Sequence, residues 1–251
     1  MSEIICLEGY IQSIYLVVYP DKLLLLDGGC RADIPMIVNY IQTILKRPIS
    51  DLKVVMVTHM HPDHAGGAHM LRRLTGCQVV SADKPKQWYH SVGGQLMHLI
   101  DTGLAHYVAK RQNRPFKCLW YPAHLQTDST VQDGDHIPNF ADWQVLETSG
   151  HTDRDLSLLH LPTRQIYIAD LIIKLRHKFV APFPIYDPIA YRRSLQNVKE
   201  LQPSKVLLAH GGALVIDEVT FDALIEQAPK QRRTVKATIY HKLSWKLYKT
   251  R

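Results

Sequence analysis

The sequence has few cysteines and lacks any long apolar run. Its four cysteines, Cys6, Cys30, Cys77 and Cys118, are scattered along the chain and form no CxxC pair. This spacing argues against a disulfide framework and a cysteine-rich zinc module, and it predicts reduced thiols. The apolar stretches fall far short of the roughly 18 residues that a membrane-spanning helix needs. We therefore expect no transmembrane segment.

A basic N-terminal region is also missing. Glu3 and Glu8 stand where a secretory leader would carry positive charge, so we expect no leader and a cytoplasmic protein. With 251 residues and 46% hydrophobic content, the chain can bury a core as one large domain or a closely fused pair. We predict a single domain over residues 1–251. The sequence does not determine the oligomeric state.

Acidic residues are absent from the C-terminal end. From Lys230 to Arg251 there are eight Lys or Arg residues and no Asp or Glu, and removing them leaves 22 basic against 23 acidic residues. The net charge of +7 therefore belongs to this segment. We expect residues 230–251 to form an accessory element, with contact to nucleic acid or anionic lipid as the less favoured role. Apolar residues recur there at intervals of four, which fits a docked helix: Val235, Ile239, Leu243 and Leu247. Apolar and polar residues also alternate in this segment, which fits a strand.

The most informative segment that is present concentrates potential metal ligands. His59, His61, Asp63 and His64 lie within six residues, directly after the apolar run 54–57. Alternate histidines leaving a strand can point at one ion, while Asp63 and His64 turn toward a second. Neutral imidazole and carboxylate are the usual ligands of zinc-like ions. An HxH pair alone is a weak signal, but the full HxHxDH pattern indicates a metal site.

Three later segments repeat this placement. His151, Asp170 and His210 each follow an apolar run that reads as a strand, and Asp27 follows the run 23–26. A scaffold of several strands delivers ligands from separate loops to one end of a sheet in this way. We therefore expect these side chains to meet the histidines of the first segment.

Taken in order, these segments resemble the motifs of the metallo-β-lactamase superfamily of metal-dependent hydrolases, over roughly Ile4 to Gly212. The resemblance implies an α/β (α+β) fold, a four-layer αββα sandwich of two mixed β-sheets flanked by helices. The residue pattern allows this fold, because strands cluster in each half with helices between them. Strands are predicted at 10–18, 22–26, 53–57, 79–81, 143–146, 156–161, 165–168 and 205–208, and helices at 33–45, 65–74 and 188–201.

The same resemblance implies a role for each ligand. The first metal would be held by His59, His61 and His151, the second by Asp63, His64 and His210, and Asp170 would bridge them. The implied cofactors are two divalent ions, with zinc favoured and iron or manganese able to use the same ligands. A hydroxide shared by the ions would attack the substrate, with Asp63 and Asp170 as catalytic carboxylates. Asp27 would hold the histidine loop through hydrogen bonds.

The carboxylate at Asp170 narrows the function. In this feature the sequence resembles the thioesterase, lactonase and phosphodiesterase-like branches of the superfamily. True β-lactamases of the superfamily usually have Cys or Ser at the matching position. We therefore predict hydrolysis of a small ester, thioester or lactone, with a nuclease or phosphodiesterase as the alternative and an iron-dependent redox protein as a third possibility. The segment 150–155 departs from the frequent Gly-His-Thr-Pro-Gly form. Its Arg154 would meet an anionic substrate or form a salt bridge with Asp153 or Asp155.

Residues 84–121, between the first and second ligand motifs, are predicted to form a helical insertion. Apolar residues recur there at helical spacing, although Gly93, Gly94 and Gly103 interrupt the pattern. Such a helix would pack on the edge of the sandwich or wall an apolar substrate pocket. Three histidines at intervals of eight drift around a helix, so we expect polar-face residues and not ligands: His90, His98 and His106.

Overall fold

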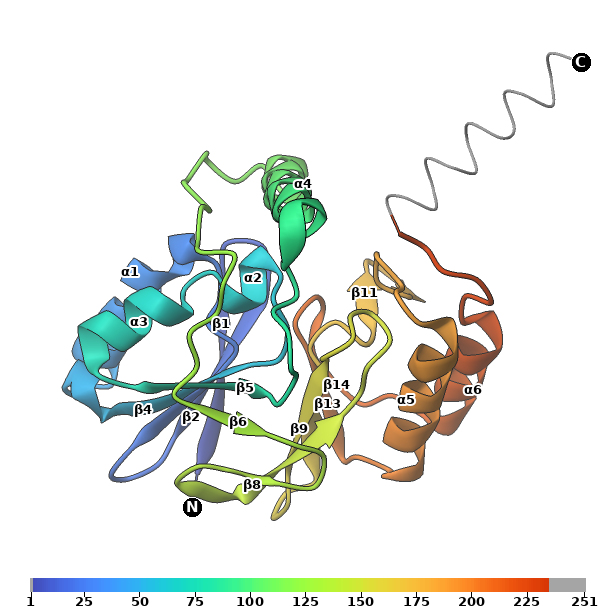
Figure 1. The fold of residues 1–251 in the computed structure, drawn as a ribbon. Coiled ribbons are helices and arrows are strands. Elements are labelled where there is room, and N and C mark those ends of the chain that lie inside the picture. The colour runs from blue at the N-terminus through green and yellow to red at the C-terminus, as the bar shows by residue number, and fades with distance from the viewer. Residues whose placement is uncertain (1, 235–251) are drawn as a thin grey trace, which may run out of the picture.

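A computed structural model, which describes residues 2–234, contains two six-stranded β-sheets packed face to face (Figure 1). The strand or helix expected between Val235 and Leu247 lies outside the described residues. Within residues 2–234, no helix is long and apolar enough to cross a membrane.

The first sheet uses only the N-terminal half of the chain and has the order β1-β2-β3-β4-β5-β6. Its strands are β1 (Glu3–Glu8), β2 (Ser13–Val18), β3 (Leu23–Leu26), β4 (Leu52–Val57), β5 (Gln78–Ala82) and β6 (Ser129–Val131). The predicted hairpin joins β2 to β3 in antiparallel register, and β3 to β6 run parallel to one another. The parallel strands β3 and β4 are almost entirely buried, as expected for strands covered on both faces.

The second sheet uses only the C-terminal half and has the order β14-β13-β10-β9-β8-β7. Its strands are β7 (His136–Ile137), β8 (Phe140–Glu147), β9 (Leu156–His160), β10 (Gln165–Tyr167), β13 (Lys205–Leu208) and β14 (Gly212–Leu214). Strands β10 and β13 are parallel and the other neighbours are antiparallel. A separate hairpin pairs β11 (Ile173–Leu175) with β12 (Lys178–Val180).

Helices cover the outer face of each sheet (Figure 1). The first sheet is covered by α1 (Ile34–Asn39), α2 (Pro62–Ala65) and α3 (Ala68–Thr75), and the second by α5 (Pro188–Glu200) and α6 (Glu218–Gln227). Short helical turns complete the list at Arg31–Asp33, Tyr40–Ile44 and Ile49–Asp51. Buried side chains of both inner faces, including Tyr15, Met56 and Trp143, form the core between the sheets. The predicted αββα sandwich of two mixed sheets is confirmed.

The predicted helix at 65–74 is two helices, because the chain turns between them at Gly66 and Gly67. A Cβ atom at Gly66 would lie 2.1 Å from the carbonyl oxygen of Pro62, and one at Gly67 would lie 2.3 Å from that of Gly28. Only glycine permits this close approach of backbone segments. The turn packs the end of the histidine segment against the loop that carries Asp27.

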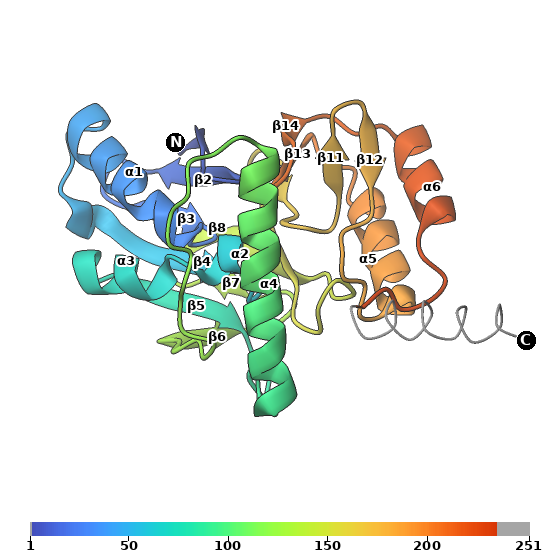
Figure 2. The same cartoon turned by 90° about the horizontal axis from the view of Figure 1, so that it is seen from above.

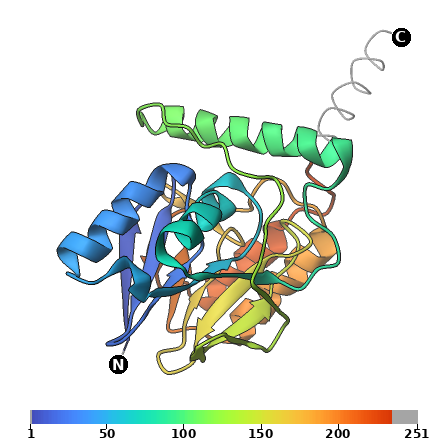
Figure 3. The same ribbon diagram turned by 60° about the vertical axis from the view of Figure 1, so that its left-hand side comes forward.

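Helix α4 (Ser91–Arg111) runs along the top of the sandwich, near the boundary between the two halves (Figures 2 and 3). It is continuous through Gly93, Gly94 and Gly103, so these glycines do not interrupt the predicted insertion helix. Ala105 and Ala109 pack on Tyr10 and Ile11 at the edge of the first sheet. The remainder of the 84–121 insertion is loop, so its helical part is shorter than expected.

Candidate metal centre

Ligand-capable side chains from both sheets meet at one end of the sandwich. The segment with His59, His61, Asp63 and His64 leaves the C-terminal end of β4. His151 follows β8, Asp170 follows β10, and His210 follows β13. Strands β8, β10 and β13 run in the same direction, so their C-terminal ends share one edge of the second sheet. Strand direction therefore brings distant residues into one cluster.

The backbone before His151 depends on glycine. Gly150 has a φ of 144°, and a Cβ atom there would lie 2.4 Å from the backbone of Tyr191 on α5. A side chain would therefore push the loop away from α5. The carboxylate of Asp155 closes the same loop by accepting hydrogen bonds from the backbone N–H and the hydroxyl of Thr152. These contacts fix the position from which the His151 ring projects.

A first group consists of His59, His61, His151 and Asp170, all buried, whose ligand atoms lie within 4.8 Å of one another. The Nδ1 atom of His61 lies 3.1 Å from Nε2 of His59 and 3.0 Å from Nε2 of His151. Oδ2 of Asp170 lies 3.6 Å from the same His151 atom and 4.0 Å from that of His59. Three imidazoles and one carboxylate oxygen thus surround one point, as in a zinc site.

A second group consists of Asp63, His64 and His210. Nε2 of His210 lies 3.1 Å from Oδ2 of Asp63, and Nε2 of His64 lies 3.9 Å from Oδ1 of Asp63. The other oxygen of Asp170, Oδ1, lies 3.3 Å from Nε2 of His64 and 3.4 Å from Nε2 of His210. Asp170 therefore directs one carboxylate oxygen to each group.

Two buried atoms between the groups have no hydrogen-bond partner, namely Nε2 of His64 and Oδ1 of Asp170. Buried polar atoms are almost always satisfied in native structures, so each such pair requires an explanation. A cation coordinated by both atoms would satisfy them. The donor set of neutral imidazole and carboxylate is the one that divalent first-row metals prefer. The residues at this site therefore fit divalent cations.

The electrostatics of the two groups differ. Burial and the neighbouring His151 lower the pKa of His61 to about 3, so its ring is neutral at physiological pH and able to ligate. Burial alone would lower the pKa of His64, but the carboxylates of Asp27 and Asp170 raise it well above its ordinary value. Burial alone would raise the pKa of Asp170, but His210 and His64 hold it well below its usual range. The second group thus favours positive charge at its centre.

Asp27 lies behind the second group. Its Oδ2 atom lies 2.7 Å from Nδ1 of His64 and accepts a hydrogen bond of 2.6 Å from the hydroxyl of Tyr167. Its Oδ1 atom accepts a hydrogen bond of 2.7 Å from the backbone N–H of Thr58. The carboxylate therefore orients His64 with Nε2 toward Asp170, and it ties the histidine segment to the end of β3.

Of the outer nitrogens of the first group, that of His151 has a hydrogen-bond acceptor, whereas Nε2 of His61 has no hydrogen-bond partner among the described residues. Nδ1 of His151 lies 2.6 Å from the carbonyl oxygen of Pro184. Nε2 of His61 lies 3.7 Å from Oδ2 of Asp101, a buried carboxylate on α4 that accepts a hydrogen bond from the hydroxyl of Tyr89. Sequence reasoning missed Asp101. It is the sole acidic residue between residues 84 and 121, and that isolation could have drawn attention to it.

The three histidines of the insertion lie outside both groups, as predicted. His98 is nevertheless 1% exposed and packs among the rings of Tyr89, Trp120 and Tyr121, so its assignment to a polar face was wrong. The loop that returns from α4 covers it.

Of the two interpretations of Arg154, the structure has the salt bridge, with Nε of Arg154 2.8 Å from Oδ1 of Asp153.

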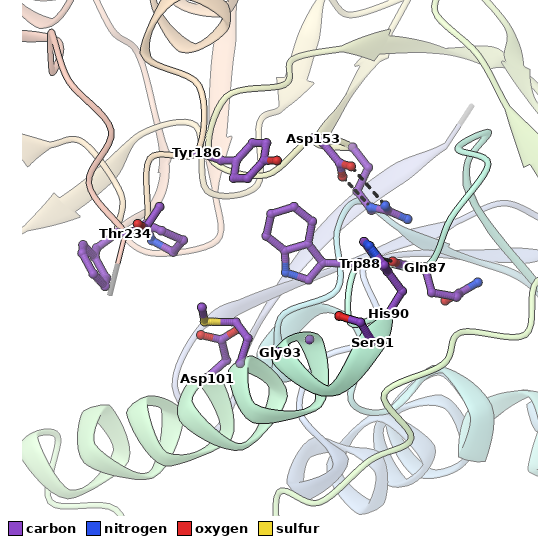
Figure 4. A pocket seen from close by; sticks show the side chains of 14 residues that line it. Gln87, Trp88, His90, Ser91, Gly93, Asp101, Asp153, Tyr186 and Thr234 are labelled. Carbon is purple, nitrogen blue, oxygen red and sulfur yellow. Dashed lines mark hydrogen bonds and ion pairs between the residues drawn. The ribbon is translucent and has the colours of Figure 1, made fainter. Parts of the chain in front are cut away.

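Two adjoining cavities open beside the cluster. The cavity at the mouth, of about 150 Å³, is lined by His61, Asp63, Asp170 and His210 together with apolar residues of α4 and Phe183. A larger cavity of about 310 Å³ lies between the start of α4 and the 183–186 loop (Figure 4). Helix α4 packs on the sandwich edge and also lines both cavities. That it walls a substrate pocket stays a prediction.

Comparison with known proteins gives a consistent result. The sequence model of the Metallo-beta-lactamase superfamily matches residues 7–210. The "Probable metallo-hydrolase YqjP" of Bacillus subtilis is 24% identical over 207 residues, which cover 74% of this chain and 61% of that protein. The chain thus spans about three fifths of the length of this curated relative.

Solved structures share the fold at low identity. An archaeal metallo-beta-lactamase superfamily protein from Sulfolobus tokodaii has a TM-score of 0.63 and 18% identity, covering 90% of this chain and 85% of that one. A metallo-beta-lactamase family protein from Thermus thermophilus has the same TM-score and identity, covering 90% and 77%. At this identity the likeness concerns the fold alone.

Proposed function

Because the chain belongs to the metallo-beta-lactamase superfamily, we propose that it is a hydrolase with two divalent cations that cleaves a small ester, thioester or lactone. The observation that carries the proposal is the position of Asp170. One of its oxygens faces the histidines of the first group and the other faces the second group. A carboxylate in this position can bridge two ions, whereas a single ion would leave the other group of ligands empty.

Each ligand has a place in this proposal. The first cation would be held by His59, His61 and His151, the second by Asp63, His64 and His210, and both by Asp170. Zinc suits these nitrogen and oxygen donors, and iron or manganese can use the same set. When bound, two such cations supply a hydroxide nucleophile at neutral pH and polarise the attacked carbonyl group.

The protein's own contribution is orientation and exclusion of water. The bonds of Asp27 to His64 and of Pro184 to His151 fix the ring orientations, which avoids reorganisation during the reaction. Asp63, held near His210, can orient the attacking nucleophile from the second group. Apolar side chains of α4 and Phe183 border the mouth, and they reduce access of bulk water.

The lining of the mouth supports a small uncharged substrate over a nucleic acid. None of the described residues that line it is Lys or Arg, and two of them, Asp63 and Asp170, are carboxylates. Binding of a phosphodiester chain depends on cationic side chains along its path. The nuclease alternative therefore receives no support from the described part of the chain.

Metal analysis combined with a substrate panel tests the proposal. Protein freed of metal and reconstituted with zinc, manganese or iron should retain about two ions per chain, as measured by mass spectrometry. It should hydrolyse esters, thioesters or lactones and leave phosphodiesters intact. Retention of one ion, or turnover of phosphodiesters alone, would overturn the proposal. Oxygen consumption by the iron form would favour the redox alternative. One solved structure with a similar fold is described as a peroxy diiron species of a chemotaxis sensor.

The ligand assignment is tested by substitution. His61→Ala and Asp170→Ala should each lower kcat by at least about 100-fold, because each removes a ligand that no neighbour replaces. His136→Ala is the matched control, since this histidine is exposed on β7 at the start of the second sheet. It should leave turnover and metal content unchanged. Equal losses in all three variants would show that the site has been misassigned. His98→Ala is unsuitable as a control, because the His98 ring is buried.

A further inference from the structure

We propose that the larger cavity binds the apolar acyl chain of the substrate while its carbonyl lies at the metal centre, an inference that rests on the proposed function. Trp88, Met97, Phe183 and Tyr186 line this cavity. The rings of Trp88 and Tyr186 meet edge to face with centroids 5.4 Å apart, on the side opposite α4 (Figure 4). A volume of about 310 Å³ falls at the lower end of the range for small-molecule sites.

The charges of the lining favour an uncharged group. Arg154 is the one Lys or Arg among the described lining residues, and it is already engaged. Its side chain pairs with Asp153 and lies over the ring of Trp88, with Cζ 5.9 Å from the centroid. Asp101 adds a second carboxylate to the same wall. A phosphate or carboxylate would meet this wall without a free cation, whereas an alkyl chain requires none.

The cavity adjoins the mouth of the candidate metal centre. Asp101 and Phe183 line both this cavity and the mouth, and Asp101 lies 3.7 Å from His61. Pro184, another lining residue, accepts the hydrogen bond of His151 through its carbonyl oxygen. A chain seated between these residues would therefore have its attached carbonyl group beside the first cation.

Gly93 determines the depth available on the α4 side. A Cβ atom at Gly93 would meet nothing nearer than the hydroxyl of Ser91 at 3.9 Å. A larger side chain at position 93 would therefore extend into the cavity without moving the backbone. Gly94, in contrast, lies against Tyr89, where a Cβ atom would approach the backbone to 2.4 Å. The structure thus assigns to Gly93 the role of a specificity-determining residue.

Helix α4 also provides a matched control. Gly103 lies on the same helix, a Cβ atom there would meet nothing within 4 Å, and it lines neither of the two cavities. Replacing either glycine by leucine raises helix propensity to a similar degree. Of the two substitutions, only Gly93→Leu would occupy the cavity. A comparison of the two variants therefore separates filling of the cavity from any effect on the helix.

The experiment measures kcat/KM on a series of esters from acetate to decanoate, with the zinc-reconstituted wild type and both leucine variants. For the wild type and Gly103→Leu, kcat/KM should rise by up to about fourfold per methylene until the cavity is filled. Gly93→Leu should lose at least about tenfold on octanoate and change by less than about twofold on acetate. Indistinguishable chain-length profiles for the two variants would overturn the inference. Should Gly93→Leu unfold, the pair Gly93→Ala and Gly103→Ala repeats the comparison with a smaller expected effect.

A binding measurement separates this inference from the proposed function. Calorimetric titration with octanamide, a neutral amide with the same chain, should show binding to the wild type and Gly103→Leu and at least about tenfold weaker binding to Gly93→Leu. If that pattern appears but no ester is hydrolysed, the cavity assignment stands and the proposed function fails. If esters are hydrolysed without chain-length preference and octanamide does not bind, the cavity assignment fails alone. Absence of both hydrolysis and octanamide binding overturns both.

Discussion

At the scale of single residues, Asp27 supports the second group of ligands without belonging to it. It accepts hydrogen bonds from Thr58 and Tyr167 and holds Nδ1 of His64 at 2.7 Å. Asp27→Asn keeps the shape of the side chain but removes its charge and directs an NH₂ group at one of these donors. We expect the affinity of the second metal site to fall about 10–100-fold, with the first site little changed. Competition with a chromophoric chelator measures the two affinities separately.

Asp142→Asn is the matched control for this prediction. Asp142 also accepts a hydrogen bond from a tyrosine hydroxyl, that of Tyr19, and lies near a histidine, His160. It lies on β8, outside both ligand groups. The control should leave both metal affinities intact. Equal weakening of the two sites by Asp27→Asn would show that Asp27 supports the fold as a whole and not the second site.

Asp33 predicts a pH dependence of stability. Burial raises its pKa to about 6 from 3.8, although the backbone N–H groups of Tyr10 and Cys30 act in the opposite direction. The folded state therefore binds more protons than the unfolded state between about pH 4 and 6, and this residue's contribution to stability falls as the pH rises through that window. The change is about 2–3 kcal/mol. Urea unfolding of the metal-free wild type and Asp33→Asn, from pH 4 to 7, should give profiles that diverge across the window, whereas parallel profiles would contradict the assignment.

Most of the candidate metal site can be read from the sequence because its signals are local. His59 to His64 form one short motif, and each remaining ligand follows an apolar run that ends in a recognisable strand. The contact of Asp101 with His61 could not be predicted, because it spans forty residues and depends on the direction in which α4 crosses the sheets. The burial of His98 was missed for a related reason, since Trp120 and Tyr121 reach it from beyond the end of the helix.

At the scale of elements, α4 is both a wall and a contributor to the site. Asp101→Asn keeps the volume of the side chain but removes the charge beside Nε2 of His61. We expect kcat/KM to fall about tenfold on every ester, with the preference for chain length unchanged, because Asn leaves the volume of the cavity as it is and the lost charge acts on His61. Nitrogen NMR of the zinc-loaded protein should show a shifted signal for the Nε2–H group of His61, which faces Asp101.

Thr102→Ala is the control for Asp101→Asn, because Thr102 neighbours Asp101 and its hydroxyl bonds only within α4, to the carbonyl of His98. It should affect stability more than turnover. An Asp101→Asn variant with normal turnover and an unchanged His61 signal would reduce Asp101 to a structural residue of the insertion.

The elements that sequence patterns predicted well are those buried on both faces. Strands β3 and β4 read as continuous apolar runs, whereas β1 was missed because Glu3 and Glu8 place charges at its ends and half of its side chains face solvent. The split between α2 and α3 was also missed. Its cause is the close approach of Gly66 and Gly67 to other backbone segments, which leaves no periodic signal.

At the scale of the molecule, each of the two groups of candidate ligands takes residues from both sheets. His59 and His61 follow a strand of the first sheet, and His151 and Asp170 follow strands of the second. Metal bound across them stabilises the folded state, by about 4 kcal/mol when its free concentration is 1,000 times Kd. Chelation should therefore lower Tm by roughly 8–15 °C in a chain of this length. Calorimetry with zinc or chelator measures the shift, and an unchanged Tm would contradict ligation from both sheets. Asp170→Ala should abolish most of the metal-dependent shift.

The single domain over residues 1–251 stays a prediction. The two sheets follow one another along the chain without exchanging strands. The first ends at Val131, the second begins at His136, and a short turn joins them. The first stretch carries His59, His61, Asp63 and His64, and the second carries His151, Asp170 and His210. Neither stretch alone completes either group of ligands. A chain interrupted at residues 132–135 would yield two complementary fragments whose reassembly is signalled by metal, so the architecture contains the elements of a split reporter for divalent cations.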